Sequence, residues 1–358
     1  MSDAVRILLL ADTHLGFDLP TRARVQRRRR GHDFLDNYAA ALAPALNGEV
    51  DLVVHGGDVF NRSRVPSSTA WLAFEPLTRV ADRGVPIVVV PGNHERGRIP
   101  QIRFAQHPRI HIFDRPRTFR LDVQGVRVAV AGFPSERHDV RGKFAGLVEA
   151  TGWRTEESDV RLLCMHQCVE GATVGPSDYT FTTASDVVRA ADIPGGFAAV
   201  LTGHIHRHQV LTTDLRGAHL GAPVLYPGSI ERTSVAEAHE EKGYLRVDVA
   251  PGRPVSWRFE RLHARPLVRR ELDPQALSGE QLEAAVRALI DASAPDAILT
   301  IRVVGEPSAA AWRVLSSANL RRLAPPTMNV EVRGERWGSA PRSQPFEPTA
   351  SRMPELPF

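Results

Sequence analysis

Short apolar runs recur along the chain, and each run stops at a polar or glycine-containing segment. Val5 to Ala11 is rich in β-forming residues, which predicts a buried strand. Asp51 to His55 and Pro86 to Val90 have the same character, as do Val160 to Met165 and Phe197 to Leu201. We therefore expect strands over these five ranges.

Segments with apolar residues at helical spacing separate the first three runs. They cover Asp33 to Leu46 and Pro66 to Arg83, and Ser67 or Ser68 can cap the second. The apolar positions are Phe34, Leu35, Tyr38, Leu42 and Leu46 in the first segment, and Trp71, Leu72, Phe74, Leu77 and Val80 in the second. Strand and helix thus alternate in a βαβ pattern, which predicts an α/β fold.

Further apolar stretches follow between residues 110 and 262. They predict strands at Ile110 to Phe113, Thr118 to Val123, Val126 to Phe133, Val210 to Thr213, Val224 to Tyr226, Tyr244 to Val249 and Val255 to Leu262. The last four alternate in the manner of antiparallel strands. Lys143 to Thr151 predicts a helix, and Glu170 to Thr183 has the composition of a loop over the site.

The pattern restarts near Arg261 to Pro266. Strands are expected at Pro266 to Leu272, Ala297 to Val304 and Met328 to Val332, and helices at Gly279 to Ile290 and Ala309 to Leu315. We predict one domain over residues 1–262, a small α+β domain over 263–334, and a proline-rich, disordered tail over 335–358.

Composition narrows the class of protein. The hydrophobic fraction of 42% and charged fraction of 24% are ordinary for a soluble globular chain. No run approaches the roughly 18 apolar residues of a membrane span, and Ile7 to Ala11 is too short for a signal-peptide core. These features predict a cytoplasmic protein. Cys164 and Cys168 flank His166, but two thiols do not close a tetrahedral zinc site.

The basic residues are almost all arginine, and the formal net charge is +4. One cluster stands out: Arg27, Arg28, Arg29 and Arg30, just after Arg22 and Arg24. Arginine forks suit phosphate, which makes a role on a nucleic-acid backbone one interpretation. A solvated basic run is the other, and both stay open at this point.

Polar residues of the metal-ligand types follow the predicted strands. They are Asp12, His14, Asp58, Asn93, His94, His166, His204 and His206. Singly, Asp12 or Asn93 could be an ordinary turn residue. Together, seven of them can complete two metal sites if one carboxylate bridges. Mixed oxygen and nitrogen ligands favour first-row divalent ions over magnesium or calcium. Two such ions suit in-line phosphoryl displacement, with an imidazole as general acid.

These residues carry a family resemblance. Asp12-x-His14, Gly57-Asp58, Gly92-Asn93-His94-Glu95, His166 and Gly203-His204-x-His206 resemble the five ordered motifs of the calcineurin-like metallophosphoesterases. Within that superfamily the chain resembles the SbcD type, the nuclease subunit of a double-strand-break repair complex. The narrower match rests on residues 12–16, 57–60 and 226–233 and on the arginine-rich helix entry. The resemblance implies a four-layer α-β-β-α sandwich with a small α+β capping domain.

The resemblance also implies roles for the residues. Asp12, His14 and His206 would bind one metal, and Asn93, His166 and His204 the other. Asp58 would bridge the two ions, usually Mn²⁺, and His94 would protonate the leaving 3′-oxygen rather than bind metal. Asn61 would contact substrate, and the interpretation of the basic cluster as a phosphate site adds Arg27, Arg28, Arg29 and Arg30 to the candidate substrate contacts. The implied activity is exonucleolytic on DNA duplex ends and endonucleolytic on single strands, in DNA repair.

Departures from the family pattern leave some points open. Asn61 stands where many members have a histidine, which puts the balance of exonuclease and endonuclease in doubt. The family dimerises through helices, so Trp71 and Phe74 are either core residues or a homodimer face. An SMC-like ATPase partner is implied, yet its usual C-terminal binding helices are replaced by the proline-rich tail. A small-molecule phosphodiesterase or phosphatase is the alternative activity, and an end-binding scaffold without catalysis is a third hypothesis.

Overall fold

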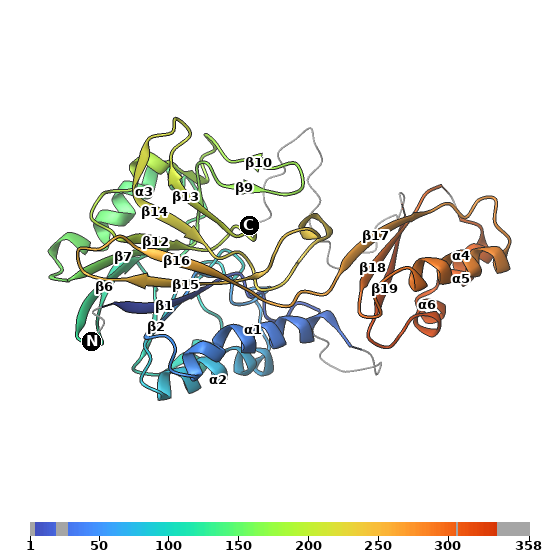
Figure 1. Ribbon diagram of the computed structural model, residues 1–358, viewed down its shortest axis with the longest axis horizontal. Helices are drawn as coiled ribbons and strands as arrows, with labels where there is room; N and C mark the ends of the chain where they lie inside the picture. The colour runs from blue at the N-terminus through green and yellow to red at the C-terminus, as the bar shows by residue number, and fades with distance from the viewer. Residues whose placement is uncertain (1–3, 19–27, 306, 335–358) are drawn as a thin grey trace.

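The computed structural model describes residues 4–18, 28–305 and 307–334, and two six-stranded sheets make up most of it (Figure 1). The first sheet has the order β16-β15-β1-β2-β3-β4. Its strands are β1 (Val5–Leu10), β2 (Leu52–His55), β3 (Ile87–Val89), β4 (Ile110–Ile112), β15 (Gly243–Val249) and β16 (Ser256–Arg261). Strands β1 to β4 are parallel, and β15 pairs antiparallel with β1 and β16.

The second sheet has the order β13-β14-β12-β7-β6-β5. Its strands are β5 (Arg117–Val123), β6 (Val126–Gly132), β7 (Val160–Met165), β12 (Ala199–Thr202), β13 (Gln209–Thr213) and β14 (His219–Tyr226). Strands β6, β7, β12 and β14 are parallel, and the edge strands β5 and β13 are antiparallel. The strands expected at Val210 to Thr213 and Val224 to Tyr226 pair antiparallel as β13 and β14, which confirms that expectation, and the other side of β14 pairs in parallel with β12.

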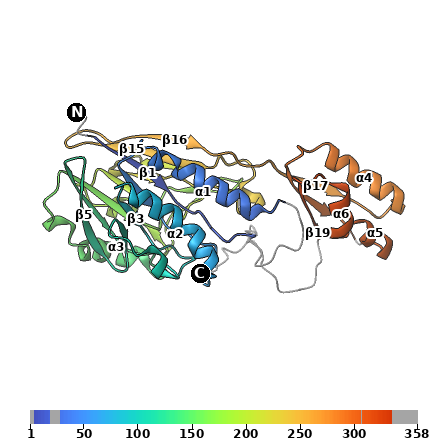
Figure 2. The same ribbon diagram turned by 90° about the horizontal axis from the view of Figure 1, so that it is seen from below.

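Period-two alternation in the strands decides how the layers stack. In β1, Leu8 and Leu10 pack with helices α1 (Arg30–Leu46) and α2 (Ser67–Asp82), whereas Ile7 and Leu9 pack between the sheets. Figure 2 shows α1 and α2 lying across the first sheet. Helix α3 (Val140–Ala150) contributes Phe144 to a third core on the far face of the second sheet. These layers confirm the predicted four-layer α-β-β-α sandwich.

A smaller sheet follows at one end of the molecule. It has β17 (Leu267–Leu272), β18 (Ile298–Val303) and β19 (Asn329–Gly334) in parallel, with helices α4 (Gly279–Asp291), α5 (Ala309–Val314) and α6 (Ser317–Leu323). It has a hydrophobic core of its own. A buried ion pair between Arg265 and Asp33 (2.8 Å) joins it to α1. The division at residues 262 and 334 stays a prediction, and the expected tail lies outside the described residues.

Several local expectations change. Trp71 is 53% exposed, so the core interpretation fails for that residue, whereas Phe74 is fully buried. Short strands lie within the expected loop and beside it: β8 (Cys168–Val169), β9 (Thr173–Val174), β10 (Tyr179–Thr180) and β11 (Val187–Val188). Helix α6 was not predicted. Within the described ranges, no helix is both long and apolar enough to cross a membrane.

Candidate metal centre

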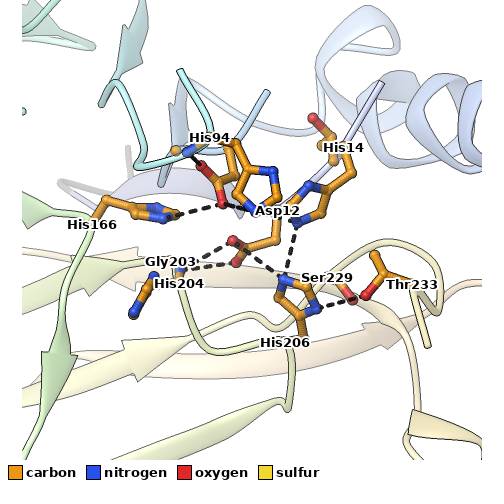
Figure 3. A network of polar contacts seen from close by, with 12 residues as sticks. Asp12, His14, His94, His166, Gly203, His204, His206, Ser229 and Thr233 are labelled. Atoms are coloured by element: carbon orange, nitrogen blue, oxygen red, sulfur yellow. Dashed lines mark hydrogen bonds and ion pairs between the residues drawn. The ribbon is translucent and has the colours of Figure 1, made fainter. Parts of the chain in front are cut away.

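The predicted ligand residues gather where five parallel strands end. Asp12 and His14 follow β1, and Asp58 follows β2. Asn93 and His94 follow β3, His166 follows β7, and His204 and His206 follow β12. The two sheets thus present their carboxyl ends to one place (Figure 3).

Backbone hydrogen bonds join the first two of these loops. The amide of Asp12 donates to Gly57 O (2.9 Å), and the amide of His14 donates to Asp58 O (3.0 Å). Asp12, His14, Asp58 and His204 all have left-handed backbone, with φ of 51°, 42°, 51° and 84°. Non-glycine residues adopt this region at an energetic cost, and such strain is concentrated at functional sites.

One donor set consists of Asp12, His14 and His206. The Nε2 atoms of His14 and His206 lie 3.0 Å apart, and His206 Nε2 lies 4.0 Å from Asp12 Oδ1. The ring of His206 is oriented from behind, since its Nδ1 lies 3.1 Å from Glu237 Oε1. Because a carboxylate only accepts, this contact leaves the Nε2 lone pair facing the site.

The other donor set consists of Asn93, His166 and His204. Asn93 Oδ1 lies 2.9 Å from His166 Nε2 and 3.0 Å from His204 Nδ1. His166 Nδ1 lies 2.8 Å from the carbonyl of Gly56, so Nδ1 carries the proton there. Asp58 lies between the two sets: its Oδ2 is 3.5 Å from His166 Nε2 and 3.9 Å from His14 Nε2.

The charges fit divalent cations. Asp12 and Asp58 are buried, and among the described residues their ion pairs go only to histidines. Burial raises the pKa of Asp12. Burial favours a higher pKa for Asp58 as well, but the charges of His166 and His94 outweigh it and hold the pKa of Asp58 well below its usual value. Donor separations of 2.9–4.0 Å suit atoms bound about 2.0–2.2 Å from one ion. Three sets of side chains bring their ligand atoms within 4.8 Å of one another. They are Asp12, His14 and His206; His14, Asp58 and His94; and Asp12, Asp58 and His166.

His94 differs from the other histidines. Its Nδ1 lies 2.9 Å from the carbonyl of Asn61, and its amide donates to Asp58 Oδ1 (2.9 Å). Since the carbonyl accepts only, Nδ1 is protonated and Nε2 faces the centre, 3.9 Å from Asp58 Oδ2. The side chain is 38% exposed, which leaves it open to a substrate. Asn61 thus reaches the site through its backbone.

The described arginines of the basic cluster are engaged with protein groups. Arg28 donates to Asp33 (2.7 Å) and Asp36 (2.7 Å), and Arg29 pairs with Asp18. Arg30 donates to the carbonyl of Arg232 and lies over the ring of Phe17. Arg27 lies outside the described residues. Contact of this cluster with phosphate stays a prediction.

Several buried groups outside the predicted ligand set hold the ligand loops in place. His55 receives the amide of Gly57 at Nδ1 (3.2 Å) and lies 3.0 Å from Thr13 Oγ1 through Nε2, which braces the first two loops. Burial lowers its pKa to about 3, so it is neutral. Its position in β2, two residues before the Gly57-Asp58 motif, was the only sequence signal.

Glu95 braces the third loop. It accepts from the amides of Phe60 (2.6 Å) and Gly92 (2.7 Å), and burial together with Asp58 raises its pKa to about 8. A Cβ on Gly92 would lie 2.1 Å from Asp58 Oδ1, so only glycine fits there. The glycine and the glutamate of the Gly92-to-Glu95 motif therefore shape the site without binding metal.

Comparison with known proteins gives the chain its family. Residues 5–208 match the calcineurin-like phosphoesterase family. "DNA double-strand break repair protein Mre11" of Methanopyrus kandleri is 27% identical over 300 residues, which are 79% of this chain and 62% of that protein. The protein of the same name from Haloferax volcanii is 28% identical over 309 residues, with coverage of 84% and 62%.

A bacterial relative is similar to the same degree. The SbcD subunit of the SbcCD nuclease of Bacillus subtilis is 28% identical over 295 residues, which are 74% of this chain and 72% of that protein. The chain spans 62% of the length of the two Mre11 proteins, so the similarity does not extend over their full length. The strand-end motifs all lie within the matched range, and the chain belongs to the calcineurin-like phosphoesterase family.

Proposed function

We propose that this chain is a DNA nuclease that uses two divalent metal ions and acts in DNA end processing and repair. The observation that carries the proposal is the position of Asp58, whose Oδ2 faces His14 of one donor set and His166 of the other. Similarity to DNA double-strand break repair proteins supports DNA as the substrate, and similarity to a subunit of the SbcCD nuclease supports cleavage of it.

The two donor sets would each hold one ion. Asp12, His14 and His206 would bind the first, Asn93, His166 and His204 the second, and Asp58 both. When bound, such ions activate water for attack and neutralise charge on the phosphate oxygens. Mixed nitrogen and oxygen donors suit a first-row divalent ion, and we propose Mn²⁺.

A side chain, His94, would supply the proton that the leaving group needs. His94 Nε2 faces the centre, and its Nδ1–H is fixed by the carbonyl of Asn61. A proton on Nε2 could therefore pass to the leaving 3′-oxygen, as general-acid catalysis requires. We propose both exonuclease activity on duplex ends and endonuclease activity on single strands, with Asn61 and the cluster Arg27 to Arg30 contacting the substrate backbone.

Two partners complete the proposal. Trp71 on α2 is 53% exposed, which suits a homodimer face on that helix, whereas Phe74 is buried beneath it. The Bacillus subtilis relative is one subunit of the SbcCD nuclease, which supports a partner subunit for this chain, and we propose an SMC-like ATPase of the SbcC type. Light scattering with Trp71→Lys tests the dimer, and co-purification tests the ATPase.

A substrate panel tests the activity. We expect the purified chain with Mn²⁺ to cut labelled single-stranded and duplex DNA, and His94→Gln to lose about 10²- to 10⁴-fold in rate with both ions still bound. His219→Gln, at an exposed position of β14, is the control and should cut normally. Turnover of aryl phosphates or cyclic nucleotides without DNA cleavage would favour the small-molecule alternative. Failure to cut any substrate would contradict both.

A further inference from the structure

A buried carboxylate outside the motif residues contacts the ligand His206. Glu237 ends a short 3₁₀ segment (Val235–Glu237), and its Oε1 lies 3.1 Å from His206 Nδ1. Figure 3 shows Thr233 beside the same ring. The hydroxyl of Thr233 donates to Glu237 Oε1 (2.6 Å) and lies 3.3 Å from His206 Nδ1. Two groups, a carboxylate and a hydroxyl, thus meet at the Nδ1 side of the ring, opposite the Nε2 atom that points to the metal centre.

A buried lysine balances the charge of this carboxylate. Lys242 is 1% exposed, and its Nζ donates to Glu237 Oε2 (2.6 Å) and to the carbonyl of His206 (3.0 Å). Lys242 therefore fixes both the backbone of His206 and the carboxylate that orients its ring.

Hydrogen bonds from Arg232 also hold the segment that carries Glu237, independently of His206. Arg232 donates through Nε to the carbonyl of Glu237 (3.0 Å) and through Nη2 to that of Glu240 (2.9 Å). Its Nη1 donates to the carbonyl of Arg265 (3.0 Å), which leads into the small sheet. The position of Glu237 therefore does not depend on His206 alone.

We propose that Glu237, held by Lys242, is a positioning residue that keeps His206 in the tautomer able to bind the first metal ion. This inference rests on the proposed dinuclear centre. As the acceptor at Nδ1, the carboxylate places the proton there and leaves Nε2 bare toward Asp12 and His14. Without a carboxylate, the Thr233 hydroxyl can donate to Nδ1 instead, which moves the proton to Nε2 and blocks the ligand atom.

Glu237→Gln tests the role of the charge. The amide keeps the size of the side chain but turns an NH₂ group either toward Lys242 or toward His206. We expect binding of Mn²⁺ alone, followed by calorimetry and electron paramagnetic resonance, to show one ion at wild-type affinity and one weakened about 10- to 100-fold. The matched control is Glu240→Gln, because Glu240 also pairs with Lys242 (3.2 Å) but its side chain bonds Arg207 rather than His206.

A measurement on the wild-type chain keeps the test independent of folding of the variant. Nitrogen NMR of the metal-free protein, at a pH where His206 is neutral, should show Nδ1 protonated and Nε2 bare. The opposite tautomer, or two ions bound to Glu237→Gln at wild-type affinity, would overturn the role of Glu237 and leave the dinuclear centre intact. A wild-type chain that binds no ion would instead contradict the dinuclear centre, and this inference with it.

Discussion

The two halves of the metal centre are built differently. In the His166 half (Asn93, His166, His204) the orienting group is a backbone carbonyl, Gly56 O, 2.8 Å from His166 Nδ1. In the His206 half (Asp12, His14, His206) it is a side chain, Glu237. The side chain of His166 is fully buried and that of His206 is 25% exposed. In the described part of the chain, the buried Nδ1 of His14 has no hydrogen-bond partner.

This difference shows in which half of the centre the orienting group can be changed by a side-chain substitution. Gly56 belongs to the loop that also carries Asp58, so the hydrogen bond to His166 follows from the packing of the two sheets. No substitution removes a backbone carbonyl. The hydrogen bond to His206 comes from a separate segment whose residues can each be changed. Substitutions in the orienting groups should therefore affect the His206 half selectively, and changes that reach both halves should pass through Asp58.

The largest expected effect comes from Asp58→Asn, because this carboxylate faces both halves. The loss of its charge leaves the facing histidines without their shared anion, and we expect neither ion to bind tightly. Loss of several kcal/mol of transition-state stabilisation corresponds to about 1,000-fold or more in rate. Metal stoichiometry and DNA cleavage measure the effect. Asp291→Asn, at an exposed carboxylate at the end of α4, is the control and should behave as wild type.

Gly92→Ala should displace the same carboxylate, that of Asp58, by crowding it with an added methyl group. The added Cβ would lie 2.1 Å from Asp58 Oδ1 and 2.4 Å from its amide nitrogen, so the loop or the side chain must move. A displacement near 1 Å at a catalytic site costs about 100-fold, and we expect a loss of that order in rate with a weaker affinity for both ions.

The control for Gly92→Ala is Gly146→Ala in α3. A Cβ at Gly146 meets nothing within 4 Å, so the same chemical change occurs in open space. We expect normal metal binding and unchanged or slightly higher thermal stability, because alanine is the better helix former. If Gly92→Ala bound both ions as tightly as this control, the close approach would not matter to the centre.

Much of the fold and of the site was predictable, for a physical reason. Strands buried on both faces leave continuous apolar runs, and the ligand residues stand directly after them in the sequence. Helix α6 was missed because its seven residues, about two turns, bury only Leu320, whereas the equally short α5 starts with three alanines, the strongest helix formers. The antiparallel pairing of β14 with β13 was predictable from local alternation, whereas its parallel pairing with β12 was not.

The orienting groups were harder to predict because they arise from tertiary packing. Glu237 lies 31 positions from His206 in the sequence, and nothing in its local pattern separates it from Glu240 or Glu241. Trp71 shares the helical spacing of the core residues, yet it is exposed. Sequence patterns therefore identified the side chains that gather at the candidate centre, whereas the structure was needed to find the groups that orient them.

Proton release should show how metal binding in the His166 half depends on pH. Burial lowers the pKa of His166, but Asp58 outweighs burial and raises it to about 9, above the ordinary value of 6.5. A ligand must lose its proton, so metal affinity should increase with pH up to about 9. In the metal-free chain the protonated ring stabilises the fold below pH 6.5, and this contribution is lost as pH rises through about 9.

Two measurements check this pH dependence. Calorimetry in buffers of different ionisation enthalpy should detect proton release when Mn²⁺ binds near neutral pH. The melting temperature of the metal-free chain should fall between pH 6.5 and about 9, whereas the metal-loaded chain should not follow that fall. A melting temperature that rose with pH in the metal-free chain would contradict the assignment of a protonated His166.

The smallest effect is expected from Thr233→Val, which changes the His206 half alone. The substitution removes one donor to Glu237 Oε1, while Lys242 still holds Oε2 and His206 still donates to Oε1. It also removes the hydroxyl that could donate to His206 Nδ1. A single hydrogen bond contributes about 0.5–1.5 kcal/mol, so affinity for one ion should weaken about tenfold or less. Calorimetry with Mn²⁺ would measure it, and equal weakening of both ions would show that the two halves are coupled rather than separately built.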